Sequence, residues 1–206
     1  MDGGTAPAAE HDAASTAQIA TPGQGTRVLA WLLVGGVVLN ALATAAVASL
    51  PGSMFFAALL LALVWLLLGA LWIVLLVLDI RDRRPSPATL VVPVLVIATA
   101  AFAVSGSALQ MRFDLARPAL QDAVDSMPAD DDYVLGPGLV GTYAITSMER
   151  VPGGVILSEA IGDSFVDDAG FAYLPAGPTP ELENGSFENP QWHDLGGGWW
   201  SWTASW

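Results

Sequence analysis

Residues 54–78 read MFFAALLLALVWLLLGALWIVLLVL, an uncharged run in which leucine is the commonest residue. At 1.5 Å per residue, a helix of this length spans the roughly 30 Å hydrocarbon core of a bilayer. An apolar run this long, without one charged side chain, is typical of a transmembrane helix. It decides the fold class, because a chain that carries it is an integral membrane protein.

Two further runs flank this segment, over residues 28–49 and 90–109, and neither contains Asp, Glu, Lys, Arg or His. The turn dipeptide Pro51-Gly52 separates the first run from the second. An arginine- and proline-containing link follows the second run. The sequence therefore predicts three transmembrane helices within residues 27–110. Proton and ion pathways usually need ionisable groups inside the membrane, so the pattern does not favour a pump or transporter.

Composition agrees with a membrane protein and limits the function. The chain has 206 residues, of which 53% are hydrophobic and only 13% are charged, against about a quarter in soluble domains. The net charge of −13 argues against nucleic-acid binding, which needs a basic surface. The absence of cysteine excludes disulfides, thiol catalysis and thiolate metal sites. Abundant alanine, with arginine but no lysine, is typical of a GC-rich bacterial genome.

Arginine placement predicts the topology, because cytoplasmic flanks are enriched in positive charge. The four arginines that flank the first two runs are Arg27, Arg81, Arg83 and Arg84. They place the N-terminus and the second link in the cytoplasm, and the C-terminal domain outside it. Arg112 and Arg117 lie on the outer side and oppose this bias. The predicted location is the cell membrane, with several spans.

The N-terminal residues 1–26 are rich in Ala, Gly, Thr and Pro and lack hydrophobic periodicity, which predicts a disordered cytoplasmic tail. An alternative concerns the first helix. Ala46-Val47-Ala48 before Ser49 is similar to a signal-peptidase site. Cleavage there would leave two spans and the same side for the C-terminal domain.

Small residues recur at four-residue spacing in the first and third runs, which lets helix backbones approach closely in lipid. These residues are Ala41, Ala45 and Ser49, and Thr99, Ala103 and Ser107. They predict helix packing, within the chain or against a partner. The alternative is that they reflect only the abundance of alanine.

Beyond the third run, the sequence predicts a helix and then a small β-rich domain, that is, an α+β region. Residues 111–132 form a juxtamembrane helix and an acidic linker, with Pro118 in the first turn. Residues 133–206 form an extracytoplasmic domain, with a hairpin of strands 139–149 and 155–161. From Met111 onward, the sequence contains 15 acidic residues and three arginines, so this part of the chain is strongly acidic.

The last 15 residues concentrate tryptophan, at Trp192, Trp199, Trp200, Trp202 and Trp206. Flat aromatic faces stack on sugar rings and cationic groups, so one hypothesis is a ligand or partner surface. Two alternatives are packing in a small core and placement at the membrane interface.

Other chemistry is poorly supported. Asp163, Asp167 and Asp168 with Glu159 could supply oxygen ligands to calcium, but their spacing does not match a calcium loop, and a solvated acidic loop is the favoured interpretation. His193 beside Asp194 could orient a base, yet no nucleophile motif accompanies the pair. We therefore predict no catalytic, cofactor or metal residues and no enzyme. The disfavoured alternative is an envelope enzyme, which would need His193 and Asp194 to face a cleft.

The run Leu195-Gly196-Gly197-Gly198-Trp199-Trp200-Ser201-Trp202, with Gly170-Phe171-Ala172-Tyr173 before it, resembles a group of uncharacterised bacterial membrane proteins from GC-rich organisms. The resemblance covers roughly residues 27–206 and implies three helices with a short outer tail. It implies no activity, and no functional residues are carried over from it.

These features lead to two functional hypotheses. The first is a membrane-anchored interaction or accessory protein that presents a small acidic extracytoplasmic domain. Its partners are the lipid bilayer and a membrane or envelope protein, or further copies of the chain. The second is binding of an extracytoplasmic glycan or small ligand through the tryptophan cluster. Neither requires a cofactor or nucleic acid.

Overall fold

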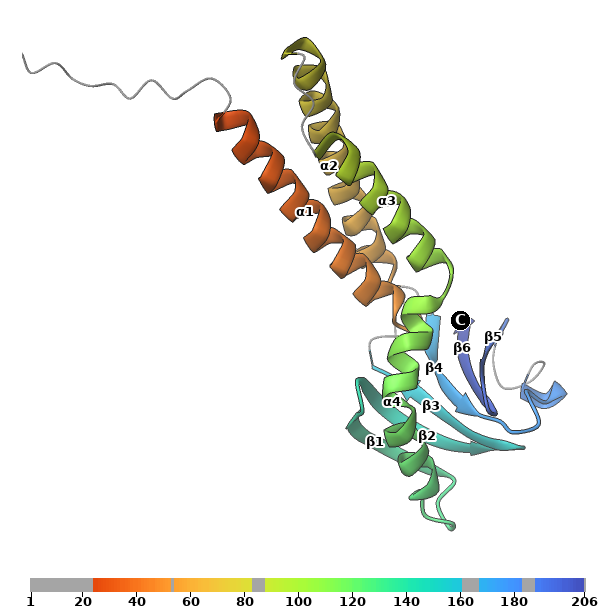
Figure 1. The fold of residues 1–206 in the computed structure, drawn as a ribbon. Coiled ribbons are helices and arrows are strands. Elements are labelled where there is room, and N and C mark those ends of the chain that lie inside the picture. The colour runs from red at the N-terminus through yellow and green to blue at the C-terminus, as the bar shows by residue number, and fades with distance from the viewer. Residues whose placement is uncertain (1–23, 53, 83–87, 161–166, 183–187, 206) are drawn as a thin grey trace, which may run out of the picture.

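The computed structural model describes residues 24–52, 54–82, 88–160, 167–182 and 188–205. Three helices form an elongated bundle, and a fourth helix with a sheet forms a body at one end of it (Figure 1). We call this body, from Ser107 to Ser205, the sheet domain. A tail was predicted for residues 1–26. Positions 1–23 lie outside the described residues, and positions 24–26 belong to the first helix.

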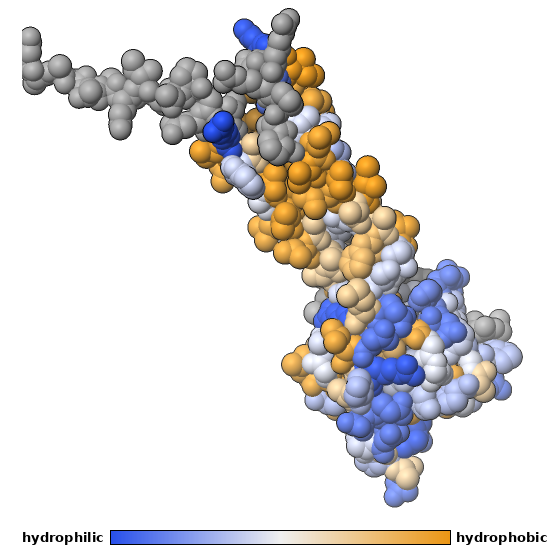
Figure 2. Space-filling model, in the orientation of Figure 1, coloured by the Kyte–Doolittle hydropathy of each residue, from blue (hydrophilic) through white to orange (hydrophobic). Residues whose placement is uncertain are grey.

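The bundle consists of α1 (Gln24–Ala48), α2 (Phe55–Asp82) and α3 (Ala88–Val104). Helix α1 contacts both other helices along its length, whereas α2 and α3 touch each other over a smaller area. The buried residues at the centre are Leu33, Val37, Leu75 and Val92. Most of the remaining leucines point outward and are exposed, so the outer surface of the bundle is almost wholly apolar (Figure 2).

Two helices of the described chain, α1 and α2, are long and apolar enough to cross a membrane. The prediction of a third continuous helix over residues 90–109 is wrong. Helix α3 ends at Val104, and the chain turns by 58° into α4 (Ser107–Asp125). Gly106 causes the break, because its φ of 71° lies in the left-handed region that a helix cannot continue through. Only the bent pair of α3 and α4 together would supply a third span.

Helix α4 is longer than the juxtamembrane helix expected from the sequence. It begins at Ser107, and Pro118 lies inside it rather than in its first turn. The buried residues Phe113, Ala116, Leu120 and Val124 recur at helical spacing and face the sheet. Pro118 is exposed on the opposite face.

Six strands form one antiparallel sheet in the order β1-β2-β3-β4-β6-β5. The strands are β1 (Tyr133–Val140), β2 (Tyr143–Val151), β3 (Gly154–Glu159), β4 (Asp167–Tyr173), β5 (Gln191–Gly196) and β6 (Trp199–Ser205). Helix α4 covers one face of the sheet (Figure 1). The last strand, β6, lies between β4 and β5, so it is an interior strand.

The two faces of the sheet carry separate cores. On the α4 face, Phe113 packs against Phe171 and Trp199, and Tyr143 meets the edge of Phe171. On the opposite face, Leu174 and Leu182 cover Ile156 and Trp202. Adjacent residues of a strand point to opposite faces, so β6 contributes Trp199 to the first core and Trp202 to the second. This double use of β6 explains why tryptophan is dense there.

The strand predictions are confirmed in part. The hairpin of β2 and β3 around residues 151–154 is present. The predicted strand 139–149 is divided by a turn at Gly141-Thr142, and its first residues belong to β1. Strands β1 and β5 were not expected from the sequence, because both contain residues that are uncommon in strands. These are Gly136, Pro137 and Gly138 in β1, and Asp194 in β5.

Gly141 provides a test of the contact between the hairpin and α4. Its φ is 60°, and a Cβ built on it would lie 3.0 Å from Cα and Cβ of Ala116. We expect Gly141→Ala to lower the midpoint of thermal unfolding, followed by near-ultraviolet circular dichroism in detergent. The loss should combine a backbone cost of ~1–2 kcal/mol with overpacking of ~1–3 kcal/mol.

Gly138→Ala is the matched control. Gly138 also has a positive φ, of 78°, but no atom lies within 4 Å of the position that an alanine methyl group would take there. It should show the backbone cost alone. Equal losses in the two variants would contradict close packing of Gly141 on α4.

Candidate functional site

The sheet domain is joined to the loop between α1 and α2 by three residues, Ser49, Arg112 and Tyr143, which we call the junction clamp. The Arg112 Nη1 donates a hydrogen bond to Ser49 Oγ at 3.1 Å. The Tyr143 hydroxyl donates to the Ser49 carbonyl oxygen, also at 3.1 Å. Arg112 further donates to the carbonyl and hydroxyl oxygens of Thr142. The clamp thus connects α1, α4 and β2.

Electrostatics reinforce the clamp. The Arg112 guanidinium lies 4.3 Å from the centre of the Tyr143 ring, a cation–π geometry. The side chain of Tyr143 is fully buried. Removal from water raises the pKa of the Tyr143 phenol well above its ordinary value, against the lowering effect of Arg112 and together with the raising effect of the Glu159 carboxylate. Tyr143 therefore stays a hydrogen-bond donor at physiological pH.

This shift predicts an alkaline loss of stability. Unfolded tyrosine ionises near pH 10, whereas folded Tyr143 stays protonated at that pH because its pKa is raised. The contribution of Tyr143 is complete below about pH 10 and falls as pH rises further, toward the pKa of the folded state. Urea unfolding of wild type and Tyr143→Phe between neutral pH and pH 11 measures it. The decline should be shallower in Tyr143→Phe, and equal slopes would refute the assignment.

The structure places the C-terminal tryptophans mainly in the cores. Trp199 is 0% exposed and its Nε1 donates to Gln121 Oε1 at 3.1 Å. Trp202 is 2% exposed and donates to the Phe171 carbonyl oxygen at 3.1 Å. Neither offers a ring face to a ligand, because both rings are enclosed by the protein. The hypothesis of a ligand platform does not fit these two residues.

The other members of the cluster differ. Trp192 and Trp200 are half-buried against the second core. The Trp200 Nε1 donates to the Leu174 carbonyl oxygen at 3.3 Å. Trp206 lies outside the described residues. Of the four C-terminal tryptophans that the structure describes, Trp192 and Trp200 are the two that keep part of their surface accessible. Any binding role of this cluster therefore falls on them.

Alanine substitutions distinguish a tryptophan in the core, Trp199, from a partly exposed one, Trp200. Trp199→Ala should destabilise the sheet domain by about 3–5 kcal/mol, because it removes a fully buried aromatic side chain, and it should abolish the near-ultraviolet signal of the folded domain. Trp200→Ala should cost less, since its ring is partly exposed. Limited proteolysis of the purified protein reports both. A folded, protease-resistant Trp199→Ala protein would contradict the core assignment.

A groove lies where the sheet domain meets the bundle, and we call it the junction groove. It has a volume of about 290 Å³ and is bounded by Pro51, Gly106 and Leu109 on the bundle side. Its floor is the α4-facing side of β5 and β6, with the polar residues Gln191, His193, Ser201 and Thr203. Trp192 and Trp202 also line it from the same strands. These amide, imidazole and hydroxyl groups can donate and accept hydrogen bonds.

The His193–Asp194 pair does not act as a unit. His193 is opposite Ser201, and Asp194 is opposite Trp200, so their side chains lie on different faces of the sheet. The Asp194 Oδ1 accepts a hydrogen bond from the Gly196 amide at 2.7 Å and shapes the turn into β6. Asp163 lies outside the described residues. Within the described part of the chain, no group of three His, Cys, Asp or Glu side chains could hold a metal ion.

Polar residues inside the bundle bond between helices. The Trp65 Nε1 donates to Thr44 Oγ1 at 3.1 Å, and Asn40 Nδ2 approaches the Leu61 carbonyl oxygen at 3.5 Å. Hydrogen bonds of this kind connect helices where water is excluded. Trp65 and Trp72 also pack against the buried centre of the bundle.

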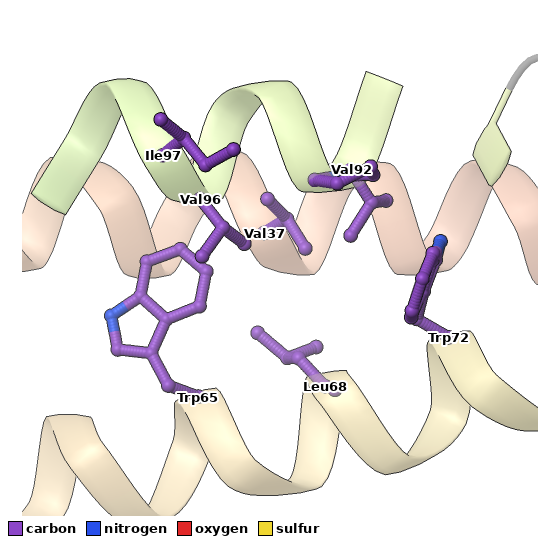
Figure 3. Close-up of a pocket in the computed structure, with 9 residues that line it drawn as sticks. Val37, Trp65, Leu68, Trp72, Val92, Val96 and Ile97 are labelled. Carbon is purple, nitrogen blue, oxygen red and sulfur yellow. The ribbon is translucent and has the colours of Figure 1, made fainter. Parts of the chain in front are cut away.

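A second cavity, also of about 290 Å³, lies between α2 and α3. Figure 3 shows Trp65 and Trp72 of α2 at its two ends, with Leu68 between them and Val92, Val96 and Ile97 of α3 opposite. Its lining is apolar except for the indole nitrogens. No titratable side chain lines it among the described residues, so it suits an apolar guest rather than acid–base chemistry.

The small residues proposed for helix packing lie on or next to contacting helices. Ala41 and Ala45 of α1 and Thr99 and Ala103 of α3 are half-buried, and α1 contacts α3. Ser49 belongs to the clamp. Ser107 lies past the bend, where its hydroxyl is 2.7 Å from that of Ser105. Their expected role in helix packing, within the chain or against a partner, stays a prediction.

Sequence reasoning did not find the clamp or the junction groove. Arg112 gave one signal, because it is a positive charge at the end of the third run, on the side that the sequence predicts to lie outside the cytoplasm. The clamp explains that position. The partners of Arg112 come from elements distant in sequence, and no local pattern brings them together.

Comparisons with models of protein families, with curated proteins and with solved structures found no match for this chain. The resemblance to uncharacterised bacterial membrane proteins therefore stays a prediction. The functional argument rests on the geometry described above.

Proposed function

We propose that this chain is a membrane-anchored interaction protein that holds a small acidic domain at a fixed orientation outside the cytoplasm. The observation that carries the proposal is the junction clamp. A domain tethered only for anchoring needs one flexible connection. Here, Arg112 and Tyr143 bind the α1–α2 loop in addition to the chain connection through Gly106.

Membrane placement is supported by the bundle. Its surface residues include leucines such as Leu39, Leu66 and Leu67 that are 65% or more exposed, which is unfavourable in water and favourable in lipid. In this proposal α1 and α2 cross the bilayer, and α3 lies in the bilayer beside them, while α4 leaves it with the sheet domain. Arg27 near the start of α1 and Arg81 in the last turn of α2 support an N-terminus in the cytoplasm, because cytoplasmic flanks are enriched in positive charge.

The membrane-distal half of the edge strand β1 is the surface proposed for a protein partner. Tyr133 and Leu135 are 55% and 79% exposed there. A bulge between Leu135 and Gly138, with Pro137 inside it, interrupts the hydrogen-bonding edge. A partner would therefore bind through side chains rather than by adding a strand.

Co-purification from native membranes in mild detergent tests this function, with mass spectrometry and a light-scattering mass. We expect a stoichiometric envelope or membrane protein. Leu135→Asp should weaken its binding by about tenfold or more, equal to ~1.4 kcal/mol. Thr146→Asp, which adds the same charge at an exposed polar position of β2, should leave binding intact. Equal effects of the two substitutions would reject β1 as the surface.

The clamp has its own test. Arg112→Ala should broaden the distribution of distances between spin labels on the bundle and on the sheet domain, and should lower partner recovery. Arg117→Ala removes the same charge elsewhere, beside Gly197, and is the control. Unchanged distances in Arg112→Ala would mean that the clamp does not fix the orientation.

The junction groove supports a second function, the binding of a small polar ligand such as a cell-envelope saccharide. Its polar floor of hydroxyl, amide and imidazole groups suits sugar hydroxyls. Titration with cell-wall fragments, followed by tryptophan fluorescence, tests it. His193→Ala should weaken binding, whereas Asp194→Ala, on the other face of the sheet, should not. No fluorescence change in the wild-type protein would reject this function.

A further inference from the structure

Three large apolar side chains of the sheet domain are exposed at its end nearest the bundle. Met111 and Leu115 lie one turn apart on α4 and are 61% and 78% exposed, and Leu139 of β1 is 75% exposed. We call these three residues the apolar rim. Soluble surfaces seldom concentrate large apolar groups in this way without a partner.

The junction clamp fixes the height of the rim relative to the bundle. Arg112, next to Met111, reaches Ser49 directly after the end of α1. Leu139 is three residues before Thr142, which also accepts hydrogen bonds from Arg112. The backbone of Gly141 lies against Ala116, the neighbour of Leu115. All three rim residues are therefore close to the level at which α1 ends.

The bend at Gly106 keeps Leu115 at that level. Leu115 follows Met111 by about 6 Å along α4, at 1.5 Å per residue. Because α4 is inclined by 58° to α3, only about 3 Å of that path leads away from the bundle. A straight continuation of α3 would have carried Leu115 about twice as far beyond Met111, at about 6 Å along the direction of α3.

Acidic residues become more frequent along α4 with distance from the bundle. The exposed residues of α4 beyond the rim include Asp122 and Asp125, and the loop after α4 contains Asp130, Asp131 and Asp132. Asp114, beside the rim, accepts a hydrogen bond from Gln110 Nε2 at 3.0 Å. Figure 2 shows apolar surface on the bundle and at the β1 side of the sheet domain, with hydrophilic surface over the rest of the visible face.

We propose that the apolar rim inserts into the interfacial layer of the outer leaflet, so that the sheet domain rests on the lipid surface. The occupant is lipid rather than a second copy or a partner, because the rim continues the lipid-facing surface of the bundle at the level where α1 ends. The acidic part of the domain is repelled by anionic headgroups and faces water. This inference rests on the proposed membrane placement.

Single-cysteine labelling tests it without background, because the chain contains no cysteine. The full chain is reconstituted, one copy per nanodisc of phosphatidylcholine, with an environment-sensitive fluorophore at Met111→Cys, Leu115→Cys or Leu139→Cys. Leu39→Cys reports a membrane span and Asp122→Cys reports the water-facing end of α4. Quenching is measured with doxyl-labelled lipid and, separately, with aqueous iodide.

We expect the three rim labels to be quenched by doxyl lipid and protected from iodide, as at Leu39, while the Asp122 label behaves oppositely. If the rim labels are quenched by iodide and not by doxyl lipid, as expected at Asp122, the inference is overturned. If the Leu39 label is still quenched by lipid in that case, the membrane placement itself remains supported. A Leu39 label that is not quenched by lipid rejects the membrane placement itself. Protection of the rim that appears only with two copies per disc assigns it to self-association and also overturns the proposal.

A second measurement avoids the labels. Leu115→Asp with Leu139→Asp should leave the near-ultraviolet spectrum of the folded domain unchanged, because both side chains are exposed. In nanodiscs, distances between spin labels on α4 and the lipid phosphates should increase. No change in these distances would contradict insertion of the rim.

Discussion

The packing of α4 on the sheet is the interaction on which the rest of the structure depends. Phe113, Leu120 and Trp199 are enclosed between the helix and the strands. A sheet of this size without a covering helix would expose one apolar face to water, and the chain has no disulfide to compensate. Because α4 also continues from α3 through Gly106, the same helix that completes the core sets the position of the sheet domain on the bundle.

The clamp follows from that position. Once α4 is packed on the sheet and bent from α3, Arg112 lies beside the end of α1, and its guanidinium donates hydrogen bonds to uncharged hydroxyl and carbonyl oxygens there. Tyr143 completes the contact from β2. A domain held in this way has one orientation, so the surface proposed for a partner, the junction groove and the apolar rim each lie at a defined height relative to the bundle.

The sequence predicts the parts of this architecture that depend on local pattern. The apolar runs identify α1 and α2, and the alternation around Pro152-Gly153 identifies the β2–β3 hairpin. The third span is misjudged because Ser105 and Gly106 interrupt a run that stays apolar on both sides. Strands β1 and β5 carry glycine, proline and charged residues that are typical of loops, and pairing with β2 and β6 overrides those preferences. The clamp and the groove were not predictable, since their residues come together only through tertiary contacts.

The place of β6 in the sheet has a consequence for biosynthesis. Strand β5 precedes β6 in the chain, yet it is bonded only to β6 among the described strands, so it has no partner until β6 has been made. The same strand supplies Trp199 to one core and Trp202 to the other. During biosynthesis, a chain that has ordered β1 to β4 but not β6 therefore has an open sheet edge at β4 and two incomplete cores. Pairing of the seven residues of β6 closes that edge, gives β5 its partner and completes both cores in one step.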